Sequence, residues 1–149
     1  MTFKQKIYHH FQQVLEEKIR LLQTVLAELK ETGANETKST AGDKHETALA
    51  MIQIEQANKR AQLDALFLQK AALDKIDASV IATAVVNGSL IKTNKGYLFL
   101  SVALGKATIG DIVITALSPQ SPLGTKLMGL KTSDKAVINN NEFVIEAIE

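Results

Sequence analysis

The sequence contains no cysteine, which excludes disulfide bonds and thiolate chemistry and fits a reducing compartment. It also has no apolar run close to the ~20 residues that a membrane-spanning helix requires. The N-terminus lacks the continuous apolar segment and the small-residue cleavage site of a signal peptide. With 17 basic and 16 acidic residues, the net charge of +1 gives no overall attraction to nucleic acid or to an anionic membrane. We therefore expect a soluble, cytoplasmic protein that binds no membrane.

The motifs of self-contained catalytic sites are missing as well. His9 and His10 are adjacent and diverge on a helix, His45 lies elsewhere, and no H-E-x-x-H spacing is present. The glycine-rich loops that bind nucleotides are absent. The second half of the chain contains no histidine that could activate a serine nucleophile. We therefore expect no enzyme activity and no cofactor of the protein's own.

The chain divides into two parts of different composition near Asp77. Residues 1–77 carry 22 of the 33 charges, no proline and only two glycines. Residues 78–149 carry both prolines and six of the eight glycines. The first part is typical of helices and the second of strands and turns. The composition predicts two domains, 1–77 and 78–149.

Two apolar seams predict a helical hairpin in the first domain. The first seam has the 4, 3, 4, 3 spacing of a heptad repeat, and apolar residues spaced by four extend it toward the N-terminus. A helix over residues 3–32 would be roughly 45 Å long, with Gly33 as its C′ residue. Residues 33–42 are polar and aperiodic, so antiparallel helices would place residues 33–46 at the tip. The seam residues are Phe3, Ile7, Phe11, Leu15, Ile19, Leu22, Leu26 and Leu29, then Leu49, Ile52, Leu63, Leu66 and Leu73, with Gln56 and Lys59 between.

The second domain has the period and the turns of a small, mainly antiparallel sheet. Asn87-Gly88, Asn94-Lys95-Gly96 and the triple asparagine at 139–141 are turn signals. Pro122 is suited to begin a short helix that Gly129 ends. The whole chain is thus predicted to be α+β, a long helical hairpin followed by a compact β domain with one short helix. The predicted strands are 80–86, 89–93, 97–104, 112–117, 135–138 and 142–148.

Asp43 and Glu46, three residues apart behind a glycine, allow two interpretations. An N-cap Asp with Glu at N3 is a capping box, in which each side chain accepts from a free backbone N–H at the helix start. Alternatively, the two carboxylates supply oxygen ligands for Mg²⁺. Because Mg²⁺ keeps several waters and needs further ligands, such a pair would complete a site on a partner. The local pattern fits both.

Two stretches resemble the Gre transcript-cleavage factors of bacterial RNA polymerase. G42-D-K-H-E46 resembles the G-D-x-x-E tip motif of that family, and N87-G-S-L-I-K-T93 resembles the opening of its C-terminal domain. S121-P-L-G-T-K-L-M-G-L-K-T-S-D134 resembles its C-terminal signature S-P-x-x-x-A-L-x-G-x-x-x-G-D without a gap. The matching positions of that signature are Ser121, Pro122, Leu127, Gly129 and Asp134.

The resemblance implies an FKBP-like C-terminal domain that docks on RNA polymerase, with Ser121, Pro122, Leu123 and Gly129 at the contact. The hairpin would enter the secondary channel of the polymerase. Asp43 and Glu46 would there help to hold the catalytic Mg²⁺ for hydrolysis of backtracked RNA, so contact with the nascent RNA is indirect. The protein would be an accessory transcription elongation factor that uses the polymerase's own active site.

Departures from the family pattern keep two other interpretations open. E46-T-A-L-A50 replaces the family's E-N-A-E-Y, and Ile54 stands where a basic residue often follows. Thr125, Lys126 and Ser133 replace an arginine, an alanine and a glycine. The chain could therefore occupy the channel without stimulating cleavage, or be a coiled-coil protein with another partner. With three aromatic residues in the second half, prolyl isomerase activity is not expected. We expect a monomer, although exposed parts of the seams leave pairing between chains open.

Overall fold

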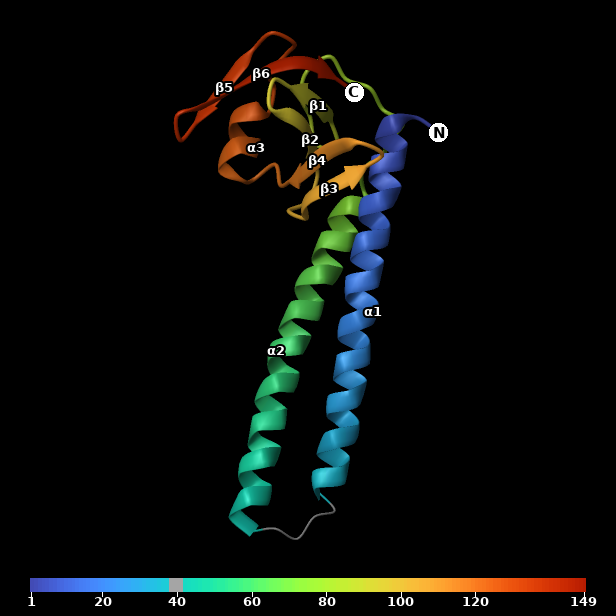
Figure 1. The fold of residues 1–149 in the computed structure, drawn as a ribbon, viewed down its shortest axis with the longest axis vertical. Coiled ribbons are helices and arrows are strands. Elements are labelled where there is room, and N and C mark those ends of the chain that lie inside the picture. The colour runs from blue at the N-terminus through green and yellow to red at the C-terminus, as the bar shows by residue number, and fades with distance from the viewer. Residues whose placement is uncertain (38–41) are drawn as a thin grey trace. The chain divides into compact units, whose positions relative to one another are not determined.

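The computed structural model describes the backbone of residues 1–37 and 42–149 and the side chains of residues 1–35 and 46–149. Two long helices precede a six-stranded sheet and a short third helix (Figure 1). The predicted α+β fold class, a helical hairpin followed by a mainly antiparallel β domain with one short helix, is confirmed. The elements are α1 (Phe3–Thr37), α2 (Gly42–Asp74), β1 (Leu90–Thr93), β2 (Gly96–Leu100), β3 (Gly105–Ile109), β4 (Ile112–Leu117), α3 (Pro122–Leu127), β5 (Lys135–Ile138) and β6 (Asn141–Ile148).

The chain forms two compact units. One contains residues 13–70, which are the larger parts of α1 and α2. The other joins residues 1–12, at the start of α1, to residues 71–149. Within residues 1–37 and 42–149, neither long helix contains an apolar stretch that could cross a membrane.

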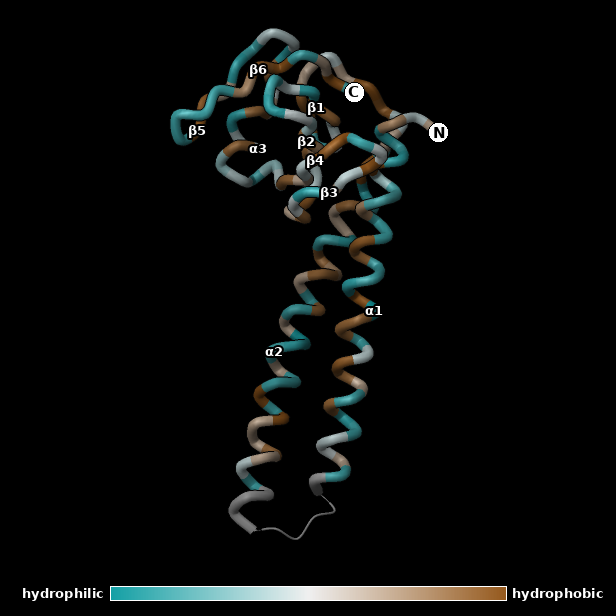
Figure 2. The backbone as a smooth tube through the Cα atoms, viewed as in Figure 1, coloured by the Kyte–Doolittle hydropathy of each residue, from teal (hydrophilic) through white to brown (hydrophobic). Residues whose placement is uncertain are grey.

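In the helical unit α1 and α2 lie side by side and run antiparallel, as predicted (Figure 1). The predicted seam positions of this unit are all at least partly buried, including Gln56 and Lys59 on α2. Lys59 tolerates this position because its ammonium lies 3.4 Å from the carboxylate of Glu55, one turn earlier. Figure 2 shows hydrophobic segments that recur along both helices. The two seams therefore hold this unit together.

The prediction that Gly33 ends the first helix is wrong, because α1 continues to Thr37. Gly33 has no left-handed backbone conformation, which a C′ glycine adopts. A Cβ at Gly33 would lie 3.6 Å from Cγ2 of Ile52, so the glycine faces α2 inside the hairpin. The predicted loop is accordingly shorter, and residues 38–41 lie outside the described part of the chain.

The sheet has the order β3-β4-β2-β1-β6-β5. Every neighbouring pair is antiparallel except β2 and β4, which are parallel. Three predicted turns are confirmed: at 87–88, at 94–95 between β1 and β2, and at 139–140 between β5 and β6. Asn139 and Asn140 have φ values of 49° and 66°, which asparagine tolerates better than most residues. Asn139 and Asn140 therefore suit the backbone of this turn, whereas Asn141 already belongs to β6.

The two faces of the sheet bury different residues. Leu90 and Phe99, paired across β1 and β2, are fully buried, and Phe11 of α1 stacks on Phe99 with ring centroids 6.1 Å apart. Ile91 and Leu98, the next pair, point the other way and belong to the hydrophobic cluster on the α3 side. The start of α1 thus covers one face and α3 the other. The buried members of the α3-side cluster are Val85, Ile91, Leu98, Leu100, Leu127, Ala136 and Ile145.

Two strand predictions are wrong. Residues 80–86 contain only one isolated bridge, from Ala84 to Lys131, and Val80 and Ile81 are largely exposed. These β-branched residues therefore form a linker instead of a strand. The long strand predicted over 97–104 ends at Leu100, and the chain bends before an additional strand, β3, begins at Gly105. Only two partly buried residues occur in β3, Ala107 and Ile109, which explains its weak apolar signal.

Candidate functional site

The acidic motif G42-D-K-H-E46 lies at the start of α2. The helical backbone places Asp43 and Glu46 three residues apart, which is nearly one turn and therefore the same face. The Glu46 side chain is exposed. The side chain of Asp43 lies outside the described residues, so the capping box and the shared Mg²⁺ site both stay predictions. Negative charge is favoured in this first turn by the helix dipole under either interpretation.

A Mg²⁺ site at the hairpin tip would need ligands from elsewhere. Among the side chains that the structure describes, no group of three histidine, aspartate or glutamate residues could hold a metal ion. Glu46 offers one carboxylate to solvent, and Asp43 would be the second ligand on the same turn. Two carboxylates fit the oxygen chemistry that Mg²⁺ prefers but leave most of its octahedral positions to water or to a partner.

The S121-P-L-G motif forms the beginning of α3. Ser121 is the N-cap: its Oγ accepts a hydrogen bond from the Gly124 backbone N–H at 3.0 Å and donates one to the Ser118 carbonyl at 2.7 Å. Pro122 occupies the first helical position, where a missing N–H costs nothing. The Ser121 carbonyl accepts from the Thr125 hydroxyl and backbone N–H, both at 2.8 Å. Ser121 is thus fully engaged within its own turn.

The rest of the motif attaches α3 to the sheet domain. Leu127 is fully buried in the cluster, and Leu123 packs against it. Gly129 follows the helix with φ of 81°, and its N–H donates to the Val85 carbonyl at 2.9 Å. The predicted short helix ended by a glycine is therefore confirmed. Asp134 accepts from the Lys131 N–H through its carboxylate at 2.8 Å and closes the next turn.

The proposed docking residues therefore differ in what they can offer a partner. Ser121 and Leu123 are partly buried and hold α3 in place, whereas Pro122 and Gly129 are exposed. Two further exposed residues extend this surface. They are Lys126, whose ammonium donates to the Val137 carbonyl at 2.6 Å, and Met128, whose side chain is 42% exposed. We call Pro122, Lys126, Met128 and Gly129 the α3 surface. Whether it binds a partner stays a prediction.

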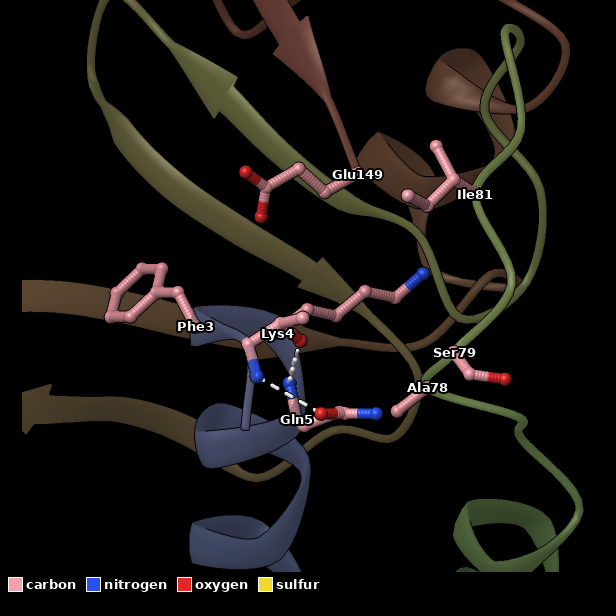
Figure 3. Close-up of a pocket in the computed structure, with 8 residues that line it drawn as sticks. Phe3, Lys4, Gln5, Ala78, Ser79, Ile81 and Glu149 are labelled. Carbon is pink, nitrogen blue, oxygen red and sulfur yellow. Dashed lines mark hydrogen bonds between the residues drawn. The ribbon is translucent and has the colours of Figure 1, made fainter.

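A cleft of about 280 Å³ in the β-domain unit was not predicted. It is formed by the N-terminal residues of α1, the linker that follows α2 and the C-terminal Glu149. Lys4 is only 5% exposed and points from α1 toward the linker carrying Ile81, whereas Phe3 points the opposite way (Figure 3). The Lys4 ammonium donates to the Val80 carbonyl at 2.6 Å.

Burial lowers the pKa of Lys4, while the charges of Glu149 and Asp77 act in the opposite direction. The pKa of Asp77 is lowered because its carboxylate accepts from the side chain and the backbone N–H of Ser79. Lys4 precedes Tyr8, Phe11 and Leu15 at spacings of 4, 3 and 4, so it falls on a buried stripe. That spacing is the signal that could have identified it in the sequence.

Solved structures similar to the chain include two of Gfh1. The crystal structure of GreA factor homolog 1 (Gfh1) of Thermus thermophilus aligns with 93% of this chain and 94% of that one, at 16% identity and a TM-score of 0.36. A structure of the transcription factor Gfh1 aligns with 95% and 92%, at 21% identity and a TM-score of 0.31. No protein-family model and no curated protein matches the chain. A likeness at this level is distant and does not show membership of a family.

The residues predicted to be functional fall in different units. Glu46 and the backbone of Asp43 belong to the helical unit, and the α3 surface belongs to the β-domain unit. The two clusters differ in their chemistry. The acidic turn offers carboxylates, whereas the α3 surface offers one cation and apolar contacts.

Proposed function

We propose that the chain is a Gre-like regulator of transcription elongation that binds RNA polymerase. In this proposal the α3 surface contacts the polymerase and the hairpin enters its secondary channel. Asp43 and Glu46 bring two carboxylates to the catalytic Mg²⁺ and orient water for hydrolysis of backtracked RNA. The catalytic framework is the polymerase's, and this protein acts as an accessory factor.

The proposal rests chiefly on the place of G42-D-K-H-E46 in the fold. The motif begins the second helix of an antiparallel hairpin, and Glu46 is exposed there. The apolar seams on both helices are at least partly buried, which supports a hairpin that presents the acidic motif at the start of its second helix. Carboxylates three residues apart on one helical face can approach the same hydrated Mg²⁺. The capping function and the metal function use the same residues and are compatible.

The α3 surface supplies the second part of the proposal. Because Ser121 and Leu123 are engaged within the domain, the contact with the polymerase is made by the exposed Pro122, Lys126, Met128 and Gly129. Met128 is an adaptable apolar side chain, which suits a protein interface. In this account Ser121 positions the surface and the exposed residues bind.

A second candidate function, channel occupation without cleavage, is favoured by the residues after the acidic pair. Ile54, which replaces a commonly basic residue, is 62% exposed. Ala50, in place of the family's tyrosine, is also exposed. Neither side chain can contact RNA phosphates electrostatically or stack on a base. Under this alternative the acids cap α2 and the protein excludes other molecules from the channel.

Transcript cleavage in stalled, backtracked elongation complexes of the cognate polymerase separates the two functions. The decisive variant is Asp43→Ser with Glu46→Gln, because Ser and Gln preserve a capping box while removing both carboxylates. We expect Mg²⁺-dependent shortening of the RNA with the natural chain, its loss with the double variant, and equal binding of both proteins to the polymerase. Unchanged cleavage by the double variant would contradict the metal-binding function. Binding without any cleavage by the natural chain would favour the second candidate.

A further inference from the structure

The linker that follows α2 keeps β-branched residues that the β domain does not bury. Val80, Ile81 and Val86 are 52%, 76% and 41% exposed. Their composition predicted a strand, yet residues 80–86 contain a single isolated bridge. Such residues stabilise a protein mainly when a neighbour covers them. Their exposure in the linker therefore needs a reason outside the fold of this domain.

Backbone hydrogen bonds fix the end of this linker beside the α3 surface. The Val85 N–H donates to the Leu130 carbonyl at 2.8 Å, and the Gly129 N–H donates to the Val85 carbonyl at 2.9 Å. The second bond joins the peptide unit between Val85 and Val86 to the peptide unit between Met128 and Gly129. The Val85 side chain is buried, whereas its neighbour Val86 points outward, as alternate residues of an extended segment do. Val86 is therefore a neighbour of the α3 surface.

Val86 and Met128 together form a small apolar patch. They are almost equally exposed, at 41% and 42%. Beside them, a Cβ at Gly129 would meet no atom of the described chain within 4 Å, so a partner can approach the backbone closely at this glycine. Single exposed apolar residues are ordinary, but two adjacent ones beside an open glycine are typical of a contact surface.

The charges that border this patch are mostly positive. Residues 80–90 contain no charged side chain, and residues 118–134 contain Lys126, Lys131 and Asp134. Both lysines are exposed. The Asp134 carboxylate accepts from the Lys131 backbone N–H at 2.8 Å and so closes its own turn. Two cations and one carboxylate favour a partner that surrounds an apolar side chain with carboxylates.

We propose that Val86 and Lys131 belong to the α3 surface, and that this extended surface binds an apolar side chain of RNA polymerase that carboxylates flank. The inference rests on the proposed function, because it names the chemistry of the polymerase element that the α3 surface contacts. Val86 adds apolar area beside Met128, and Lys131 adds a second cation to that of Lys126. The linker is thus part of the binding surface, which accounts for the exposure of its last β-branched residue.

Biolayer interferometry with the immobilised cognate core polymerase tests the apolar part. Val86→Glu should weaken binding at least about tenfold, because its carboxylate would replace an apolar contact and repel the partner's carboxylates. The fold should tolerate this change, since the Val86 backbone N–H still donates to Ser89 Oγ. Val113→Glu is the matched control, because Val113 is 49% exposed on β4, outside the extended surface. Its affinity should stay within about twofold of the natural chain's.

The same assay at two salt concentrations tests the charged part. Lys131→Gln should weaken binding about threefold at low salt, and the difference should vanish at about 0.5 M salt, where surface charges are screened. Lys106→Gln, at an exposed position of β3, is the control and should bind like the natural chain. A Lys131→Gln variant that binds normally at low salt would contradict the proposed flanking carboxylates.

The possible outcomes separate this inference from the proposed function. If the natural chain and Val86→Glu bind the polymerase equally well, or if Val113→Glu is weakened as much as Val86→Glu, the inference is overturned and the proposed function stands. A natural chain that forms no complex would contradict the proposed function and the inference together. Hydrogen exchange in the complex is a second measurement that needs no variant: amides of residues 80–86 should exchange more slowly than in the free chain. Unchanged exchange there would also overturn the inference.

Discussion

Gly124 shows how strongly one residue can control the α3 surface. A Cβ at this position would collide with the Ser118 carbonyl oxygen and lie 2.9 Å from Ser121 Oγ and 3.0 Å from the Pro119 Cα. The tight turn before α3 therefore requires that position 124 have no side chain. The Gre signature does not predict this requirement for glycine, because it specifies no residue at position 124.

Gly124→Ala should destabilise the protein by about 3 kcal/mol, because backbone atoms have to move to admit the methyl group. Gly129→Ala is the matched control: Gly129 has φ of 81° but open space around it, so the cost is backbone strain of about 1 kcal/mol. Urea unfolding followed by circular dichroism measures both. A smaller loss for Gly124→Ala than for Gly129→Ala would contradict the steric argument.

Ser121→Ala should cost about 1 kcal/mol of unfolding free energy, because the Gly124 N–H loses its capping acceptor. Thr132→Ala, at an exposed turn, removes a hydroxyl that is not a helix cap. Its unfolding free energy should stay within about 0.5 kcal/mol of the natural chain's. Chemical denaturation of the three proteins side by side measures the difference. Equal stabilities would contradict the capping function of Ser121 and would favour a docking function for its side chain.

Lys4 gives a pH-dependent contribution to stability. Because burial lowers its pKa, the unfolded chain binds the Lys4 proton at pH values where the folded chain has lost it. The natural chain should therefore gain stability relative to Lys4→Met as the pH rises from the lowered pKa toward 10.5, the ordinary value. Urea midpoints of both proteins at several pH values up to about 10.5 test this. A difference that is constant with pH, or that changes in favour of Lys4→Met, would contradict it.

At the scale of single elements, α1 shows why its end could not be predicted. Glycine is the commonest residue beyond a helix end, so Gly33 gave a strong stop signal. The helix nevertheless continues because Gly33 lies against Ile52 of α2 in the hairpin, a tertiary contact that local sequence does not reveal.

Gly33→Ala distinguishes a glycine inside a continuous α1 from a glycine at a left-handed helix end. Inside a helix, with Ile52 at an ordinary contact distance of 3.6 Å, alanine should stabilise the protein by about 0.5 to 1 kcal/mol. At a left-handed helix end the same change would destabilise it by a similar amount. The thermal midpoints of the two proteins give the sign, and a lower midpoint for Gly33→Ala would contradict a continuous α1.

Elements with local signals were predictable, and elements that depend on distant partners were not. The seams, the three turns and α3 follow from spacing and from residues such as Pro122 and Asn139 that restrict the backbone. Residues 80–86 have the composition of a strand but remain a linker with a single bridge. Neither the restriction of residues 80–86 to one bridge nor the parallel pairing of β2 with β4 is encoded in a short window of sequence.

At the scale of the whole molecule, the sequence indicated the candidate residues but not the units to which they belong. The first twelve residues carry the same apolar pattern as the rest of α1, yet Phe11 stacks on Phe99 of the β domain. The acidic turn could be recognised because its residue types are suited to Mg²⁺ and to a helix start.

The central claim is that this chain binds RNA polymerase through the α3 surface. Native mass spectrometry of the chain mixed with its cognate core polymerase tests this claim most directly. The account predicts a complex that Met128→Glu with Lys126→Glu weakens at least tenfold, because both exposed residues would then present negative charge to the partner. Asp43→Ser with Glu46→Gln should leave the complex intact. Absence of a complex, or a complex that is indifferent to the α3 variant, would contradict the account.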